Sequence, residues 1–439
     1  MKPGALSIYR DFHRRKVPVV AVIVLGIIWA IFEWGDPGEE SSDDVVEAIA
    51  RSADVSMTLG EQLGGWSRPV SWLLAEENRG ETRAWVMDDL KREELLSLTD
   101  LDEFLTGRIS KEDEDELLVR LSIRGEKPDA EEWAKLKEDY DGLALYSWEA
   151  AALEKLDGAP AWVGTTVARR AEMQRWMLFG TWGAAGATAL AMVAGLFGLP
   201  AAWRGLRDAR PPRLALRVVS WRWGLFAFFL SDLALGWMVG RAWDGVDAVA
   251  SSSLLVEAAI DAAWRLGGAA LLMVLVLPRF QDGWRVFGFD RQLGWKATLG
   301  MLGLLLVGSS VWYPLSLSWF PEAPALLFDE DGWGGLGYAL LSGVVLAPLC
   351  EELVFRGCLF GTLWQRVGFW PATLASSLVF SAIHHYGVPG SVGVFAIGVA
   401  ACVLFRHTRS LKGPILLHAA YNFLITLAVW PVYQAPYSL

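Results

Sequence analysis

The sequence predicts an all-α fold: a polytopic helical membrane protein with about nine transmembrane helices and a small helical extramembrane domain inserted after the first span. Hydrophobic residues make up 53% of the 439 residues, and the mean hydropathy is +0.31, which is high for a chain of this length. Apolar runs near membrane-spanning length recur along the chain, and one long charged segment interrupts them. This composition excludes disordered and fibrous proteins.

The acidic charge is concentrated in one segment. Residues 36–157 contain 33 acidic and 14 basic residues, a net charge of −19, whereas the whole chain carries −11. The remaining hydrophobic body is therefore basic. Because the chain has 39 basic against 50 acidic residues and no basic tract, no nucleic acid is expected as a partner. The three cysteines form no zinc-binding pattern, and a disulfide framework is not expected.

The N-terminal part combines a basic flank, an apolar run at 17–32 and the acidic insert. We interpret residues 1–35 as a cytoplasmic N-terminus and signal-anchor helix, because no small-residue cleavage pattern follows the apolar run. A cleaved signal peptide is the alternative. Residues 36–170 are expected to form an acidic extracytoplasmic helical domain, since polar and apolar positions recur there every three to four residues.

The rest of the chain is hydrophobic and divides into eight further spans. These lie at 177–199, 219–240, 254–278, 297–319, 335–355, 371–386, 388–405 and 413–430. We expect residues 171–295 to hold transmembrane helices 2–4 and residues 296–432 to form the C-terminal membrane core. Basic residues gather in alternate connections, as the positive-inside rule requires. This predicts a multi-pass protein of a bacterial inner membrane, embedded in membrane lipid, with a cytoplasmic N-terminus and an extracytoplasmic C-terminus.

Charged residues inside two of these spans need an explanation. Glu257, Asp261 and Arg265 recur every four residues, and we interpret them as an interfacial turn with an Asp261–Arg265 ion pair. Asp232 in the third span is ambiguous. An intramembrane carboxylate is a functional hypothesis by default, but this one can also be a structural residue satisfied within the bundle.

The C-terminal core carries a cluster of ionisable residues. Glu351 and Glu352 are adjacent at the end of an apolar run, and two carboxylates in such a setting need partners. Downstream, His384 and His418 lie in apolar spans, where ionisable side chains usually face a bundle interior or an aqueous cavity. His385 follows His384 directly.

Helical spacing suggests how these residues pair. Glu352 and Arg356 are four residues apart and can form an ion pair, while Glu351 points about 100° away from Glu352. Phe380 precedes His384 by four residues and offers an aromatic floor for its ring. In the same way, four residues separate His418 from Asn422, so that an imidazole and an amide lie side by side.

A depth argument brings these segments together. If the helix that carries Glu351 turns at Gly368, Glu351 lies 17 residues before the turn and His384 lies 16 residues after it. The two side chains then have nearly the same depth in an antiparallel hairpin. The next turn returns His418 to the bundle. We therefore expect one buried polar pocket.

The residues quoted above resemble the CPBP intramembrane proteases, which include the type II CAAX prenyl proteases. EELVFR matches the EExxxR pattern of that family, FSAIH matches FxxxH, and HAAYN matches HxxxN, in the family's order, over roughly residues 297–430. The resemblance implies peptide-bond hydrolysis in the membrane. Glu351, with His384, would then activate a water, and His418 with Asn422 would stabilise the oxyanion. Glu352 and Arg356 would hold the helix of Glu351 in place, with Glu352 also able to touch the water.

A metal-dependent version remains open. It places a divalent metal such as zinc on Glu351, His384 and His418, with Glu352 as the base. The sequence fits both versions, and we favour the one without a cofactor. A transporter, or a non-catalytic scaffold with the same polar cluster, is the alternative from another functional class. The expected partner of the enzyme is a protein or peptide substrate, for which an exported protein with a C-terminal membrane anchor is one hypothesis.

Overall fold

The computed structural model of the chain is helical throughout the part that it describes. The described residues are 17–34, 127–140, 153, 156, 158–207, 221–247, 254–279, 283–317, 319–320 and 332–433. Within these ranges the backbone forms helices and turns, with no strand, so the predicted all-α class is confirmed there. Most of the acidic insert lies outside the described residues.

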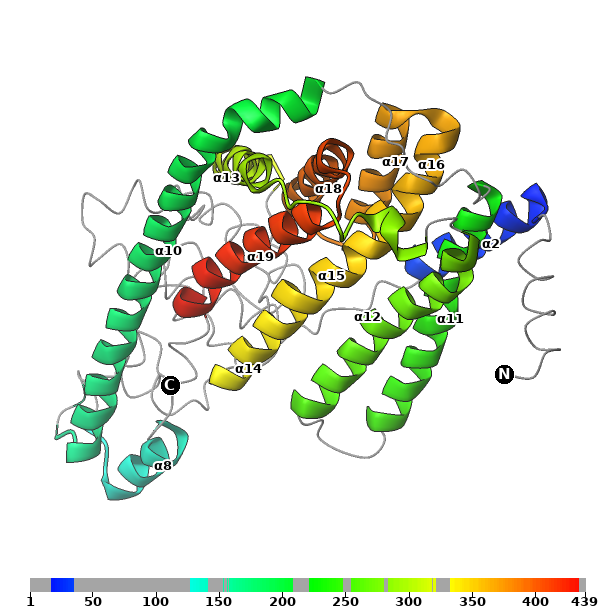
Figure 1. Cartoon of the computed structure of the whole chain (residues 1–439). Coiled ribbons are helices and arrows are strands. Elements are labelled where there is room, and N and C mark those ends of the chain that lie inside the picture. The colour runs from blue at the N-terminus through cyan, green and yellow to red at the C-terminus, as the bar shows by residue number, and fades with distance from the viewer. Residues whose placement is uncertain are drawn as a thin grey trace. The chain divides into compact units, whose positions relative to one another are not determined.

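Figure 1 shows the helices in chain order. Their bounds are α2 (Val19–Trp34), α8 (Ala130–Tyr140), α10 (Ala161–Arg207), α11 (Trp221–Asp247), α12 (Leu254–Val276), α13 (Trp295–Leu317), α14 (Gly332–Ala339), α15 (Ala347–Glu351), α16 (Gly361–Val367), α17 (Phe369–Ala382), α18 (Val388–Thr408) and α19 (Lys412–Tyr433). Short 3₁₀ turns cover Leu277–Arg279 and Gly283–Phe287. Two π-helical stretches, Leu340–Leu346 and Glu352–Phe360, lie on either side of α15.

Six helices of the described part are long and apolar enough to cross a membrane. They are Ala161–Arg207, Ala258–Val276, Trp295–Tyr313, Trp333–Val367, Val388–Thr408 and Lys412–Trp430. Two more predicted spans coincide with shorter apolar helices, Val19–Ile31 and Phe369–Ala382. The span predicted at 219–240 is helical in α11 but is not among the six. The multi-pass helical character is therefore confirmed, while the count of nine stays a prediction.

The chain divides into two compact units. The first contains residues 1–39, 187–309 and 337–426, and the second contains residues 40–186, 310–336 and 427–439. Helix α10 is continuous through residue 170, where the sequence suggested the end of the acidic domain. The candidate site belongs to the first unit.

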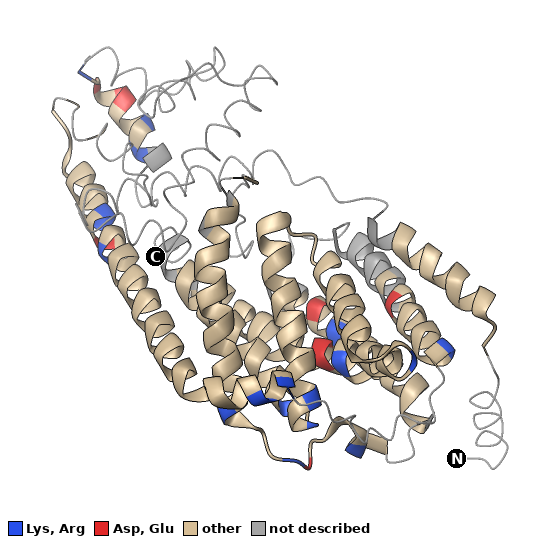
Figure 2. Ribbon diagram, turned by 90° about the horizontal axis from the view of Figure 1, so that it is seen from above, with Lys and Arg blue, Asp and Glu red and all other residues tan. Residues whose placement is uncertain are grey.

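Basic connections of the first unit meet at one end of its helices. The side chain of Lys412 donates a hydrogen bond of 3.0 Å to the carbonyl of Arg291, which joins the turn before α19 to the segment before α13. The backbone of Gly288 lies against that of Arg409, and Gly205 lies against the ring of His407. Figure 2 shows Lys and Arg gathered at this end. The described parts of these connections therefore lie at one end of the first unit.

An aromatic core supports the site from behind. Trp29, Phe228, Phe355, Leu359 and Phe380 are buried together, at 1–4% exposure. The ring of Phe355 contacts both Phe228 and Phe380, at centroid distances of 5.6 and 4.9 Å in edge-to-face geometry. Such pairs add to the free energy of area burial by about 0.5–1.5 kcal/mol each. The core therefore fixes α17 against the helix that carries Glu351.

Helices α10 and α13 cross at glycines. A Cβ on Gly300 would collide with the backbone carbonyl of Gly198, and Gly303 faces Gly195 in the same way. Small residues let helix backbones approach closely within a membrane, where dispersion contacts drive association. This crossing anchors α13 beside α18 and α19 through a shared apolar cluster that includes Leu306, Leu404 and Leu417.

The described part of the second unit has its own small core. Helix α8 begins with a reciprocal cap: the Asp129 carboxylate accepts hydrogen bonds from the backbone N–H groups of Glu131 and Glu132, both 2.9 Å, and Glu132 accepts one from the N–H of Asp129. Leu136 is fully buried with Val163, against the ring of Trp133. Residues 130–140 therefore form an amphipathic helix, as the sequence pattern predicts.

Candidate active site

Glu351 lies at the end of α15, which has a π-helical stretch on each side. Pro348 follows the first π-helical stretch, and a proline in a helix interior removes one backbone hydrogen bond and displaces the preceding turn. The wider π turns on both sides are a common device at functional sites. Together they set the rotation of Glu351 and release backbone carbonyls for side-chain contacts.

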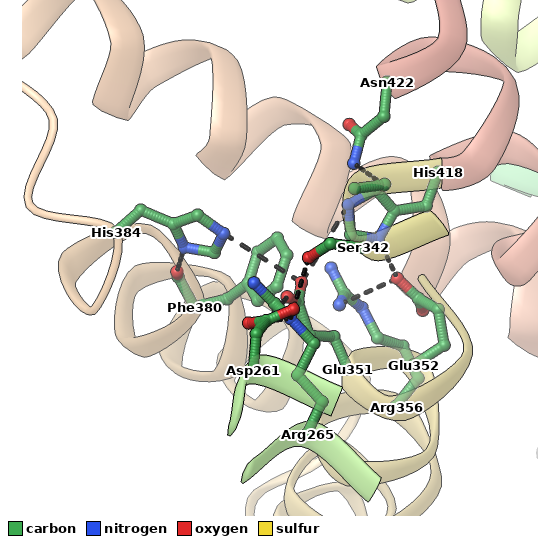
Figure 3. Close-up of polar contacts among 11 residues, drawn as sticks. Asp261, Arg265, Ser342, Glu351, Glu352, Arg356, Phe380, His384, His418 and Asn422 are labelled. Carbon is green, nitrogen blue, oxygen red and sulfur yellow. Dashed lines mark hydrogen bonds and ion pairs between the residues drawn. The ribbon is translucent and has the colours of Figure 1, made fainter. Parts of the chain in front are cut away.

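The Glu351 carboxylate faces two imidazoles from other helices. Its Oε2 atom lies 3.9 Å from Nε2 of His384 and 3.9 Å from Nε2 of His418. Oε2 is buried and makes no hydrogen bond. The three residues that the depth argument brought together do converge (Figure 3), and the separations are too long for direct hydrogen bonds.

His384 follows the last turn of α17. Its Nδ1 lies 2.6 Å from the carbonyl oxygen of Phe380, a contact that assigns the proton to Nδ1. In the neutral ring, Nε2 then carries the lone pair that faces Glu351. The ring itself packs edge-to-face on Phe380, with 4.8 Å between centroids. The aromatic floor predicted from the spacing is therefore present.

Glu352 and Arg356 form a buried ion pair, as predicted. Nη1 of Arg356 lies 2.9 Å from Oε1 of Glu352, with side-chain exposures of 1% and 0%. Nη1 makes no hydrogen bond, so the contact is electrostatic. The guanidinium also lies 4.2 Å from the ring centroid of Phe380, within cation–π range. Arg356 thus joins the carboxylate to the aromatic core.

His418 has a second partner that the sequence reasoning missed. Its Nδ1 lies 3.2 Å from Oε1 of Glu352. A carboxylate can only accept, so Nδ1–H donates. His418 can therefore present another N–H at Nε2 only as an imidazolium. Spacing gave no signal for this contact, because 66 residues separate the two side chains.

Asn422 lies one turn beyond His418 on α19. Its amide Nδ2 donates a hydrogen bond of 2.7 Å to the carbonyl oxygen of Gly343, in the first π-helical stretch. The same nitrogen carries a second hydrogen that this contact does not use. The amide is thereby fixed beside the imidazole, as the four-residue spacing suggested.

Helix α12 contributes two residues that we had interpreted as an interfacial turn. The predicted pair exists, with Arg265 Nε at 2.8 Å from Asp261 Oδ1. Arg265 also reaches Glu351, however, at 3.0 Å between Nη1 and Oε1. The Ser342 hydroxyl donates to Asp261 Oδ2. The structural interpretation was therefore incomplete, and the available signal was the presence of ionisable groups within an apolar span.

Asp232, the other ambiguous carboxylate, is satisfied by a neighbour. The indole Nε1–H of Trp29 donates a hydrogen bond of 2.7 Å to its Oδ2 atom. The contact joins α2 to α11 within the first unit. Asp232 is accordingly accounted for as a structural residue.

The alternative ligand set does not form a zinc geometry as placed. Tetrahedral zinc with ligands at about 2.0–2.1 Å puts neighbouring donor atoms about 3.4 Å apart, whereas Oε2 of Glu351 is 3.9 Å from each imidazole nitrogen. Over the described ranges, no three His, Cys, Asp or Glu side chains are arranged to hold a metal ion. We therefore derive no step through a metal.

Comparisons with known proteins match the part of the chain that holds this site. Residues 333–424 match the family model described as type II CAAX prenyl endopeptidase Rce1-like. CAAX prenyl protease 2 of Homo sapiens is 31% identical over 115 residues, which cover 22% of this chain and 35% of that protein. The membrane-embedded CAAX protease MroQ of Staphylococcus aureus is 33% identical over 89 residues, covering 19% and 36%.

These matches are partial. The chain spans about a third of the length of the curated relatives that it matches, 35% and 36% for the two named. No solved structure matches the chain. The matched segment nevertheless contains both glutamates, both imidazoles and the asparagine of the pocket, on the helices of a multi-pass membrane protein. Residues 333–424 are therefore similar to the Rce1-like type II CAAX prenyl endopeptidases.

Proposed function

We propose that this chain is an intramembrane endopeptidase that hydrolyses a peptide bond of a membrane-associated protein or peptide. The observation that carries the proposal is the gap between Glu351 Oε2 and the Nε2 atoms of His384 and His418. A water oxygen about 2.8 Å from each atom would bridge the two 3.9 Å separations. The buried Oε2, which has no hydrogen bond, faces this position.

Glu351 and His384 activate the water. The carboxylate and the unprotonated Nε2 of His384 are both acceptors, so both O–H groups of the water can point at them. One lone pair of the water then accepts from Nε2–H of His418, and the other is free for attack. As the oxygen bonds to the scissile carbonyl carbon, a proton passes to Glu351. When the carbon–nitrogen bond breaks, that proton goes to the leaving amine. The second proton of the water stays on the new carboxyl group and then passes to the amine, so the products are a carboxylate and an ammonium group.

His418 and Asn422 stabilise the oxyanion. In the imidazolium form His418 presents Nε2–H, and the free hydrogen on Nδ2 of Asn422 is a second donor. Glu352 accepts from the other nitrogen of His418 and is itself paired with Arg356. Donors fixed before the reaction are worth more than mobile ones, because no reorganisation accompanies the charge development.

The similarity to CAAX proteases suggests the chemical class of the substrate and not its identity. A peptide with a hydrophobic or prenylated C-terminal tail can reach a base that lies within the apolar spans. An exported protein with a C-terminal membrane anchor remains our candidate substrate. For the enzyme itself we propose a cytoplasmic N-terminus and an extracytoplasmic C-terminus.

The test uses the purified full chain in lipid nanodiscs. One fluorogenic probe is an S-farnesylated peptide with a CAAX terminus, and a second is an unprenylated peptide ending in an apolar span with basic residues. Glu351→Gln should lower hydrolysis of the cleaved probe by more than about 10²-fold, because it removes the base and keeps the shape. Glu172→Gln, at an exposed position on α10, is the matched control. Equal rates in wild type and Glu351→Gln, or no cleavage of either probe by the wild type, would contradict the proposal.

A further inference from the structure

The contact between helix α12 and Glu351 has no counterpart in the three family patterns. Asp261 and Arg265 lie outside the matched residues 333–424. They are nevertheless in direct polar contact with the pocket, because Arg265 Nη1 is 3.0 Å from Oε1 of Glu351 (Figure 3). Both side chains are largely buried, with exposures of 24% and 16%.

This contact gives the two oxygens of Glu351 different surroundings. Oε1 is bound by Arg265, and Oε2 faces the imidazoles of His384 and His418. The terminal torsion of a glutamate is broad, so the backbone alone does not fix the plane of the carboxylate. An external cation on one oxygen fixes that plane and thereby directs the other oxygen.

Arg265 is itself held in one orientation. Its Nε lies 2.8 and 3.1 Å from the two oxygens of Asp261, and Asp261 accepts a further hydrogen bond from the hydroxyl of Ser342. A guanidinium is planar, with its N–H groups in a rigid fork, so fixing Nε also fixes the direction of Nη1. The chain of contacts therefore starts on α12 and the first π-helical stretch and ends at the base.

We propose that Arg265 is a positioning residue for the base, oriented by Asp261 and Ser342, so that Oε2 of Glu351 faces the water position between the imidazoles. The inference rests on the proposed peptidase function. It extends the site beyond the matched segment to a helix that the family patterns do not include. Arg265 acts through Glu351 and does not touch the water position itself.

Kinetics of Arg265 variants test the proposal. Arg265→Ala should lower kcat by about 10–10²-fold with KM within about twofold, as for other residues that orient a catalytic group. Added guanidinium ion should restore part of the kcat of Arg265→Ala. Arg265→Lys keeps the charge without the fork and should fall between wild type and Arg265→Ala. Arg207→Ala removes a cation that stacks on Trp203 at 4.7 Å and is the matched control, with unchanged kcat.

A double variant separates positioning from general damage. In a Glu351→Gln background, Arg265→Ala should cause no further loss, because residues that act as a unit are not additive. Asp261→Asn, which keeps one acceptor, should lower kcat less than Arg265→Ala and retain the unfolding midpoint of the wild type. An unchanged or increased kcat in Arg265→Ala, a loss confined to KM, or an equal loss in both backgrounds would overturn the inference while leaving the proposed function intact. A wild type that cleaves neither probe overturns both.

Discussion

The ion pair between Glu352 and Arg356 offers a quantitative test of how the pocket is held together. The two side chains are 0% and 1% exposed, and their charged atoms are 2.9 Å apart. Removing one partner of such a pair leaves an uncompensated buried charge, at a cost of about 3–5 kcal/mol, whereas replacing both by apolar residues is often neutral or stabilising. The variants are therefore Glu352→Met, Arg356→Met and the double substitution.

The contacts of Glu352 and Arg356 determine which variant should lose the most unfolding free energy. Glu352→Met removes the carboxylate beside the guanidinium, which keeps its contacts with the rings of Phe380 and Phe355, and orphans Nδ1–H of His418. It should therefore lose about 3–5 kcal/mol or slightly more. Arg356→Met leaves Glu352 with His418 as a partner and should lose less. The double variant orphans only Nδ1–H, a cost of about 1–3 kcal/mol that apolar packing partly offsets.

Reversible unfolding by SDS in mixed micelles measures these differences. The 24 tryptophans of the chain provide the fluorescence signal. Arg366→Met, at an exposed position of α16, is the control and should stay within about 0.5 kcal/mol of wild type. If the double variant loses as much stability as the two single variants combined, the pair is not coupled and the reasoning is refuted.

Three further predictions follow from the fold and the pocket. Gly300→Leu should separate α10 from α13 and lower the midpoint of unfolding. Gly308→Ala is the control and should leave the midpoint unchanged, because a Cβ at residue 308 enters open space. Equal unfolding midpoints for the two variants would contradict the close crossing of α10 and α13. Hydrolysis by the purified chain should persist in a strong chelator, and activity lost there and regained with added Zn²⁺ would establish the metal-dependent version. Cysteines introduced at Arg207 and Arg409 should both resist an impermeant thiol reagent in sealed cells, and labelling of either would refute a cytoplasmic location of this end.

Local spacing in the sequence was sufficient for the contacts within one helix. The pair of Glu352 with Arg356 and the packing of His384 on Phe380 are both four residues apart, and both are present. The turn at Gly368, where φ is +85°, also places Glu351 and His384 at one depth, as counting residues predicts. These predictions needed only helix geometry and the length of a hairpin.

Contacts between different helices could not be predicted from the spacing of residues in the sequence. Arg265 meets Glu351 across 86 residues, and that contact depends on how α12 is rotated about its axis. Asn422 bonds the carbonyl of Gly343, which is available because the helix is π-wound there, and π winding has no distinct sequence signal.

The two π-helical stretches also limit which insertions and deletions this helix tolerates. A π turn holds one residue more than an α turn, so losing a single residue from Leu340–Leu346 could return that stretch to α winding without shortening the hydrophobic match by more than about 1.5 Å. Because the change of winding absorbs the lost residue, Glu351 would keep nearly its present rotation. The same loss would however close the π turn in which the carbonyl of Gly343 is available to Asn422. Across related chains, insertions and deletions should therefore accumulate in the connections and spare this helix, even though its apolar residues are interchangeable for a lipid environment.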